Sequence, residues 1–423
     1  MANTLLDIVN RQKAGEAVGI CSVCSSSPFV IEAALKQAVC HHTDVLIEAT
    51  ANQVNQFGGY TGMLPEDFKN WVLTLADQYG LERDRVILGG DHLGPVAWQK
   101  ESADAAMDKA ESLVRSFAKA GFTKIHLDCS MPLGEEKTLS TETIADRTVR
   151  LCRASEEEFK RTGQSLPVYV IGSEVPTPGG SGEEDALSVT KPSALADMID
   201  CFKDKFTAAD LPWERVVAAV VQPGVEFGND NIHAYVPEEA KELAKTAKGI
   251  PGIILEGHST DYQTADSLAA MVRDGIAILK VGPALTFAAR EGLFALEEME
   301  RASLDGNAAL SNFADILDAV MLQKPANWQN HYTTCEPEST FLRKYSFSDR
   351  SRYYMNEPEV QEALGRLIDN LRACPPKVML LSQYMPVQYQ KVREEKLDSD
   401  PRSLVIDKVC EVLDQYWQAC GLI

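Results

Sequence analysis

Short apolar segments alternate with amphipathic segments along the first 300 residues, and this alternation constrains the fold most. Eight runs rich in β-branched and other apolar residues are predicted to be strands. They are residues 18–23, 45–49, 86–90, 124–128, 168–174, 216–222, 252–256 and 276–281. Strands that are apolar along their whole length belong in a parallel sheet that is covered on both faces. Eight such units predict an α/β protein with a closed (β/α)₈ barrel, a TIM barrel.

The segments between the runs, and the end of the chain, have the periodicity of helices. Inside the barrel region we predict helices at 65–79, 102–120, 141–162, 193–206 and 237–247. Beyond residue 300 we predict helices at 308–322, 358–373 and 403–420, separated by proline-containing connections. The sequence therefore predicts a barrel over 1–300 that carries the active site, and a C-terminal helical extension over 301–423 packed on it.

The composition excludes some kinds of partner. Lys and Arg number 41 against 62 Asp and Glu, a net charge of −21, which repels nucleic acid and anionic membranes. Charged residues interrupt the first twenty positions, so we expect neither a signal peptide nor a transit peptide. No apolar run is long enough to span a bilayer. Ten cysteines without a framework spacing suggest reduced thiols, and we expect a cytoplasmic protein.

Polar residues stand at the end of nearly every predicted strand. In a TIM barrel the active site lies at the carboxyl ends of the strands. The residues there are Glu48, Asp91, His92, His126, Asp128, Glu174, Gln222, Glu256, His258 and Lys280, with Gln53 in the segment that follows the second strand. Burying a polar group costs free energy unless it is satisfied, and barrel-rim hydrogen bonds would explain single cases only. The whole set predicts an enzyme.

Imidazole and carboxylate groups from several strands suit a divalent metal, with zinc favoured by imidazole. We expect His92 and His258 to be ligands, with Glu174 and Asp128 as the next candidates; the alternative for each histidine is a satisfied position at the barrel rim. Asp91 points away from His92 on an ideal strand. The preceding Gly89-Gly90 pair would permit a bend that brings both into the site.

The segment 343–354 is the most basic patch of this acidic chain. Its Arg and Ser donors, Ser346, Arg350 and Arg352 among them, are predicted to bind one phosphate group. The alternative is a helix surface or a subunit contact. Glycine-rich segments at 57–62 and 178–182 could cover a substrate, although glycine alone is a weak signal.

Several blocks of the sequence resemble one family. The blocks Leu-Ile-Glu-Ala-Thr at 46–50, Leu-Gly-Gly-Asp-His-Leu-Gly-Pro at 88–95 and His-Ser-Thr-Asp-Tyr-Gln at 258–263 look like the Z-subunit family of tagatose-1,6-bisphosphate aldolase. Further blocks at 19–25, 52–63, 124–130, 171–176, 221–227, 279–287 and 345–354 do so as well, whereas 178–188 and the helix after it match poorly. The resemblance implies a barrel related to the metal-dependent ketose-bisphosphate aldolases.

The resemblance also implies one of two functions. Some members are described as non-catalytic subunits that stabilise a catalytic aldolase chain, and others as epimerases of D-tagatose 6-phosphate and D-fructose 6-phosphate at C4. Asp91 and His92 look like the catalytic Asp and a metal-ligand His of the aldolases, and His258 and Glu174 fall on matching strands. A further His that many aldolases carry before that Asp is absent, because Gly89 and Gly90 stand there.

The chemistry of C4 inversion supports a set of roles. The C4 hydroxyl is β to the ketone, so cleavage and re-formation of the C3–C4 bond can invert that centre. We expect acid–base or electrostatic roles for Asp91, Glu174, Glu256 and Lys280. Substrate contacts are expected from Glu48, Gln53, Asp128, Gln222 and the basic patch. The predicted function is a metal-dependent 4-epimerase of ketohexose 6-phosphates, with zinc as the expected metal. The alternatives are an accessory subunit of an aldolase, a free-standing bisphosphate aldolase and a sugar-binding protein. A homo-oligomer is possible in each case.

Overall fold

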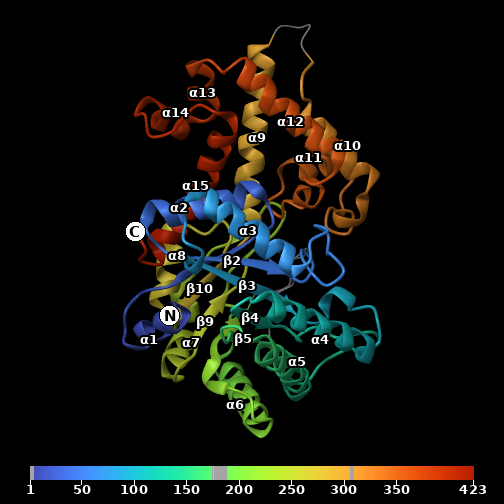
Figure 1. Ribbon diagram of the computed structural model, residues 1–423, viewed down its shortest axis with the longest axis vertical. Helices are drawn as coiled ribbons and strands as arrows, with labels where there is room; N and C mark the ends of the chain where they lie inside the picture. Colours follow the sequence, from blue (N-terminus) through green and yellow to red (C-terminus); the bar gives the residue numbers. More distant parts are fainter. Residues whose placement is uncertain (1–3, 174, 176–187, 305–308) are drawn as a thin grey trace.

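The computed structural model describes residues 4–173, 175, 188–304 and 309–423, and within these residues a closed parallel barrel forms the lower half of the molecule (Figure 1). Around the barrel the strands follow the order β1-β10-β9-β6-β5-β4-β3-β2. Their bounds are β1 Ile20–Cys24, β2 Val45–Thr50, β3 Val86–Leu93, β4 Lys124–Leu127, β5 Val168–Ile171, β6 Val216–Val221, β9 Ile254–Gly257 and β10 Ile276–Val281. The predicted (β/α)₈ barrel is confirmed, with every predicted strand present.

Helices between the strands form the outer layer of the barrel. They are α2 Pro28–His41, α3 Pro65–Tyr79, α4 Ala103–Ala120, α5 Thr141–Thr162, α6 Pro192–Ala208, α7 Pro237–Gly249 and α8 Ala265–Arg273. Their apolar faces and the outward side chains of the strands make one large buried cluster. A second buried cluster joins inward residues such as Val168 and Val170 to Leu5, Ile8 and Val9 of α1 (Thr4–Lys13). Helix α1 therefore packs against the barrel interior.

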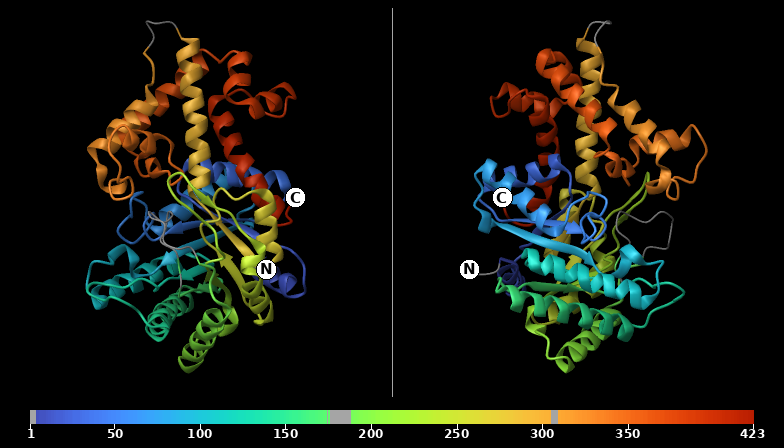
Figure 2. Two further views of the ribbon diagram at one scale, coloured as in Figure 1. Left: turned by 180° about the vertical axis from the view of Figure 1, so that it is seen from behind. Right: turned by 45° about the vertical axis from the view of Figure 1, so that its right-hand side comes forward.

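The C-terminal extension stands above the barrel in all three views (Figures 1 and 2). Helix α9 (Pro283–Ser303) follows the last barrel strand and rises into the extension (Figure 1). The extension itself comprises α10 Phe313–Gln323, α11 Glu338–Tyr345, α12 Pro358–Ala373, α13 Val378–Tyr384, α14 Pro386–Arg393 and α15 Pro401–Ala419. None of the helices in the described ranges is both long and apolar enough to cross a membrane.

The last helix returns to the barrel. Helix α15 packs against α2, α8 and α9, and so covers β1 where the ring of barrel helices would otherwise be open. Trp417 Nε1 donates a hydrogen bond to Thr43 Oγ1 at 2.9 Å, and the Tyr416 hydroxyl donates to the carbonyl oxygen of Thr260 at 2.7 Å. The division into 1–300 and 301–423 stays a prediction. The packing shows that the end of the chain supports the loop after β9.

Three local features differ from the sequence expectations. The helix predicted at 308–322 begins at Phe313, because Ser311 is held by the Glu300 carboxylate and Asn312 adopts a left-handed conformation with φ of 47°. A small hairpin, β7 (Glu226–Phe227) with β8 (Ile232–His233), was not predicted. The same is true of α11, α13 and α14, which are short helices of seven or eight residues.

If α15 is part of the barrel wall, truncating its largest buried side chain will destabilise the whole protein. Trp417 is 1% exposed, and we expect Trp417→Ala to lower the free energy of unfolding by about 3–5 kcal/mol. Met379 on α13 is 66% exposed, so Met379→Ala serves as the control, with an expected change below about 0.5 kcal/mol. Urea unfolding followed by circular dichroism measures both. Equal effects would place α15 outside the cooperative unit.

Candidate active site

Three histidine side chains meet at the carboxyl ends of the barrel strands. His92 comes from β3, His126 from β4, and His258 directly follows β9. All three are at most 5% exposed. Their ring centroids are 5.2 Å apart for His92 and His126, 4.9 Å for His92 and His258, and 5.3 Å for His126 and His258. Three strands that are distant in sequence thus place three imidazoles around one point.

A bend in β3 brings both Asp91 and His92 to this point. His92 has φ of 48°, and the pairing of β3 with β4 shifts register between Gly90 and Leu93. The two preceding glycines are required by close packing. A Cβ at Gly89 would lie 2.6 Å from Glu48 Cγ, and one at Gly90 would lie 2.5 Å from Leu93 Cδ1. The Gly-Gly pair therefore leaves room for the glutamate beside it and for the bend after it.

Each imidazole is oriented by a carboxylate. His92 Nδ1 lies 2.8 Å from Asp128 Oδ2, His126 Nδ1 2.8 Å from Asp91 Oδ1, and His258 Nε2 2.9 Å from Glu256 Oε1. A carboxylate in this position fixes the tautomer of an imidazole and makes its other nitrogen a better metal ligand. With the proton on Nδ1, His126 presents the lone pair of Nε2, an atom that is buried and has no hydrogen-bond partner among the described residues.

The pKa values of the histidines differ because of their neighbours. Burial alone would lower the pKa of His92, but the negative charges of Asp91 and Asp128 outweigh it and raise that pKa. Burial dominates at His258 and, with repulsion from His92 and Lys280, lowers its pKa to about 3. His258 is therefore neutral at physiological pH, which is the form that metal binding requires.

A layer of paired charges lies behind the histidines, and we call it the buried ion network. It consists of Glu48, Asp91, Lys124, Glu256 and Lys280, and none of these side chains is more than 6% exposed. Lys124 Nζ lies 2.5 Å from Glu48 Oε1 and 2.7 Å from Glu256 Oε2. Lys280 Nζ lies 2.7 Å from Glu48 Oε2 and 2.6 Å from Asp91 Oδ1. The network links the carboxylates that orient His126 and His258.

Mutual pairing keeps these buried groups charged. Burial would lower the pKa of Lys280, yet the carboxylates around it raise that pKa well above its ordinary value. Burial would raise the pKa of Asp91, but His92, Lys280 and His126 hold it well below the ordinary value. Cys24 Sγ also donates a hydrogen bond to Asp91 Oδ2, at 3.3 Å. Asp91 is thus an ionised carboxylate with fixed orientation.

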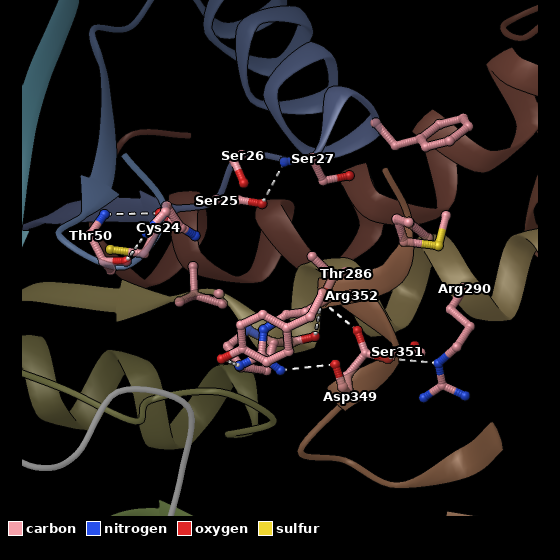
Figure 3. Close-up of a pocket in the computed structure, with 18 of the residues that line it drawn as sticks. Cys24, Ser25, Ser26, Ser27, Thr50, Thr286, Arg290, Asp349, Ser351 and Arg352 are labelled. Carbon is pink, nitrogen blue, oxygen red and sulfur yellow. Dashed lines mark hydrogen bonds and ion pairs between the residues drawn. The ribbon is translucent and has the colours of Figure 1, made fainter. Parts of the chain in front are cut away.

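His92 and His258 line a cavity of about 240 Å³ between the barrel and the extension, and His126 lies behind them. Figure 3 shows one side of it, where Cys24 to Ser27 lie near Thr286 and Arg352. Of the residues predicted for the site, those that line the cavity are Gln53, Asp91, His92, His258, Lys280 and Arg352. Glu48, Asp128 and Glu256 stand behind these residues and bind to them.

Three of the predicted residues lie elsewhere. Gln222 Oε1 accepts the backbone N–H groups of Gly224 and Val225. Ser346 Oγ lies 2.9 Å from Ser348 Oγ, and Arg350 NH2 lies 3.0 Å from His331 Nδ1. None of these three lines the cavity. Glu174 lies outside the described residues.

Sequence reasoning passed over Lys124, and it placed His126 at a strand end without giving that histidine a role; the structure places both in the site. The signal was the alternation in Lys-Ile-His-Leu-Asp at 124–128, where the polar residues share one face of the strand. That face is the interior of the barrel, so Lys124 joins the buried ion network and His126 joins the histidines. Asp91, His126, Glu256 and His258 each offer a ligand atom, all within 4.8 Å of one another.

Removing Lys124 will leave two buried carboxylates without their shared partner. We expect Lys124→Met to lower the free energy of unfolding by about 3–5 kcal/mol, measured by urea denaturation. Lys109 pairs with Glu101 at the surface, where the two side chains are 35% and 38% exposed. The matched substitution Lys109→Met is therefore expected to cost less than about 1 kcal/mol. A similar small loss for Lys124→Met would contradict the pairing described here.

Comparison with known proteins identifies the family of this chain and several similar solved structures. A sequence model described as D-tagatose-1,6-bisphosphate aldolase subunit GatZ/KbaZ-like matches residues 5–421. The crystal structure of a probable tagatose 6 phosphate kinase from Sinorhizobium meliloti 1021 shares 42% identity with a TM-score of 0.86, covering 95% of this chain and 100% of that one.

Two more distant structures were also found. The YdjI aldolase from Escherichia coli K12 has 13% identity and a TM-score of 0.43, covering 86% of this chain and 95% of its own. The fructuronate-tagaturonate epimerase UxaE from Cohnella laeviribosi has 11% identity and a TM-score of 0.48, covering 96% and 82%.

Proposed function

Because the chain belongs to the GatZ/KbaZ-like family of D-tagatose-1,6-bisphosphate aldolase subunits, we propose that it acts on a ketohexose phosphate. The reaction that suits the site best is the interconversion of D-tagatose 6-phosphate and D-fructose 6-phosphate by inversion at C4. One observation carries this proposal: three buried imidazoles cluster beside an ionised Asp91, and His92, His258 and Asp91 line a cavity. A protein that only stabilised a partner would gain nothing from burying so many polar groups.

The donor set fits a divalent metal ion. Nε2 of His126 is buried without a partner among the described residues, and each imidazole is already oriented by a carboxylate. We assign His92, His126 and His258 as the ligands, with Glu174 as a further candidate, and nitrogen ligands of this kind favour zinc. A bound zinc ion would polarise the C2 carbonyl and stabilise negative charge on the fragment that contains it.

Asp91 is the group that moves the proton. Its carboxylate takes the proton of the C4 hydroxyl, the C3–C4 bond breaks, and the bonding electron pair passes to the three-carbon ketone fragment as its enediolate. The C4 aldehyde then turns its other face, C3 attacks it, and Asp91 returns the proton. Lys280 and Cys24 hold the two oxygens of Asp91, and Glu256 fixes His258. The walls of the cavity retain the aldehyde between the two steps.

The comparisons support the substrate class in a second way. The protein from Sinorhizobium meliloti is described as a probable kinase of tagatose 6-phosphate, a sugar phosphate of the same kind. The present sequence has no Gly-Lys pair and hence no Gly-x₄-Gly-Lys-Ser/Thr motif for a nucleotide. Epimerisation within the barrel needs no nucleotide, and we therefore favour it over phosphoryl transfer.

A second candidate function is that of an accessory subunit for a catalytic aldolase chain. The family description names a subunit, and the α13–α14 hairpin exposes apolar side chains, among them Val378, Met379 and Val387. Such residues suit contact with another protein. We place the protein in the cytoplasm, where sugar phosphates are metabolised.

Loss of His126 will weaken metal binding. Since removal of a residue that merely orients a ligand costs about 10–100-fold in affinity, we expect His126→Ala to weaken zinc binding at least about 100-fold. Competition with a chromogenic chelator measures this without any substrate. His233, which is exposed on β8, provides the control His233→Ala, with unchanged zinc affinity. Equal affinity in the two variants would remove His126 from the ligand set.

The activity can be tested on the purified chain alone. Incubated with zinc and D-tagatose 6-phosphate, it will form D-fructose 6-phosphate, followed by ¹³C NMR at C4, and chelation will stop the reaction. Asp91→Asn is expected to lower kcat by about 10²–10⁴-fold, the usual contribution of an acid–base group. Asp77→Asn, at a surface position, is the control.

Two results would count against the enzyme. Turnover that survives Asp91→Asn would exclude Asp91 as the acid–base group. Absence of turnover, together with activation of an added aldolase chain, would establish the accessory subunit instead.

A further inference from the structure

The cations that line the cavity are not equivalent. Among the described residues they are Lys280, Arg290, Arg352 and Arg402. Lys280 is paired within the buried ion network, Arg290 Nε lies 2.7 Å from Asp349 Oδ1, and Arg402 pairs with Glu32. Arg352 has no carboxylate within 4.0 Å among the described residues. It is the cavity cation whose charge is left without a counter-ion.

The contacts of Arg352 are with neutral groups. Its NH1 donates to the carbonyl oxygens of Ser348 and Asp349, and its NH2 donates to the Tyr353 hydroxyl at 2.9 Å. The Asp349 side chain makes no ion pair with Arg352 within 4.0 Å, and its two oxygens bind Arg290, Thr286 and Ser351 instead. The guanidinium is thus fixed in position by carbonyl groups while its charge remains available. A partly buried charge of this kind is stabilised by an anion.

The segment Ser25–Ser26–Ser27 borders the same cavity, and we call it the serine loop. It leads from β1 into α2, whose N-cap is Ser27, and the Ser27 hydroxyl makes no capping hydrogen bond. The backbone N–H of Ser27 is bound by Ser25 Oγ at 3.2 Å, which holds the loop in shape. Figure 3 shows the serine loop and Arg352 bordering one pocket. Hydroxyl groups and a guanidinium together suit a phosphate.

The other helix terminus at the cavity is closed to an anion. In many TIM barrels, phosphate binds after the seventh and eighth strands at a helix N-terminus. Here Asp261 Oδ1 accepts the backbone N–H groups of Gly282 and Ala284 at 3.0 and 2.8 Å, at the start of α9. A carboxylate of the chain itself occupies the position that an anion would take. The serine loop and Arg352 therefore provide the alternative.

We propose that Arg352 and the serine loop form the single anion subsite of the cavity, and that it holds the phosphate of a sugar monophosphate. The proposal rests on the proposed function for the nature of the ligand. The proposal also concerns substrate specificity. The other cavity cations, Lys280, Arg290 and Arg402, are already paired with carboxylates of the chain, so a second phosphate on the substrate would find no ionic partner. The cavity consequently gives a ketose bisphosphate no advantage in affinity over a monophosphate.

Binding of inorganic phosphate to the full-length protein tests the subsite without turnover. Titration calorimetry on the protein as purified, and again after chelation, will give a dissociation constant that Arg352→Met raises at least about tenfold, as loss of a charge-assisted hydrogen bond requires. Arg402→Met, which removes a cavity cation already paired with Glu32, is the matched control and will leave phosphate binding unchanged. Equal binding by wild type and Arg352→Met, or equal weakening by both variants, would overturn the proposal.

Two further measurements cover the remaining outcomes. If Arg352→Met does not fold, Ser27→Ala serves in its place, and it must weaken phosphate binding severalfold for the subsite to stand. Fructose 6-phosphate and fructose 1,6-bisphosphate will bind with affinities within about threefold of each other, and a bisphosphate preference above tenfold would contradict the single subsite. Phosphate binding that depends on Arg352 in a protein without epimerase activity would uphold the subsite and reject the proposed function. Epimerase activity in a protein whose phosphate binding does not depend on Arg352 would uphold the function and reject the subsite.

Discussion

The pairing of two lysines with three carboxylates inside the barrel is the interaction on which the site depends. Each of these five groups would be very costly to bury alone, and each becomes tolerable because its neighbours carry the opposite charge. Lys124 bridges Glu48 and Glu256, and Lys280 bridges Glu48 and Asp91. Since each charge is paired with its neighbours, no side chain of the network can move without leaving another buried charge unpaired. The network is therefore a rigid base for the histidines above it.

This rigidity reaches the reacting atoms through the carboxylates. Asp91 and Glu256 belong to the network and each also binds an imidazole, His126 and His258 respectively. A metal site built in this way has its ligands oriented before the ion arrives, which reduces the entropy lost on binding. The cost appears in the backbone, where His92 and Ser259 both adopt left-handed conformations next to the site. Strain of this kind is commonly found at functional positions.

The sequence was sufficient for the barrel and for part of the site. Period-two alternation and apolar runs are local properties, so the strands could be located, and the polar residue at each strand end followed from the fold. His126 was placed at a strand end in this way, and Lys124 could have been found by the same alternation. Helix α15 could not be assigned to the barrel wall, because its partners α2 and α8 lie far away in sequence. The state of Arg352 also required the structure, since an arginine is free or paired only in relation to side chains from other segments.

The extension and the barrel differ in architecture, yet both contribute residues to the same cavity. The histidines belong to barrel strands, whereas Arg352 comes from the extension, and the cavity between them is lined by both. Tyr416 of α15 holds the carbonyl of Thr260, two residues from His258, and the Thr260 hydroxyl in turn donates to the carbonyl of Lys280. A chain lacking its last helix would thus lose support at both His258 and the buried ion network. The residues after the barrel therefore complete the site in two ways: they supply Arg352 to the cavity, and they hold the loop after β9 through Tyr416.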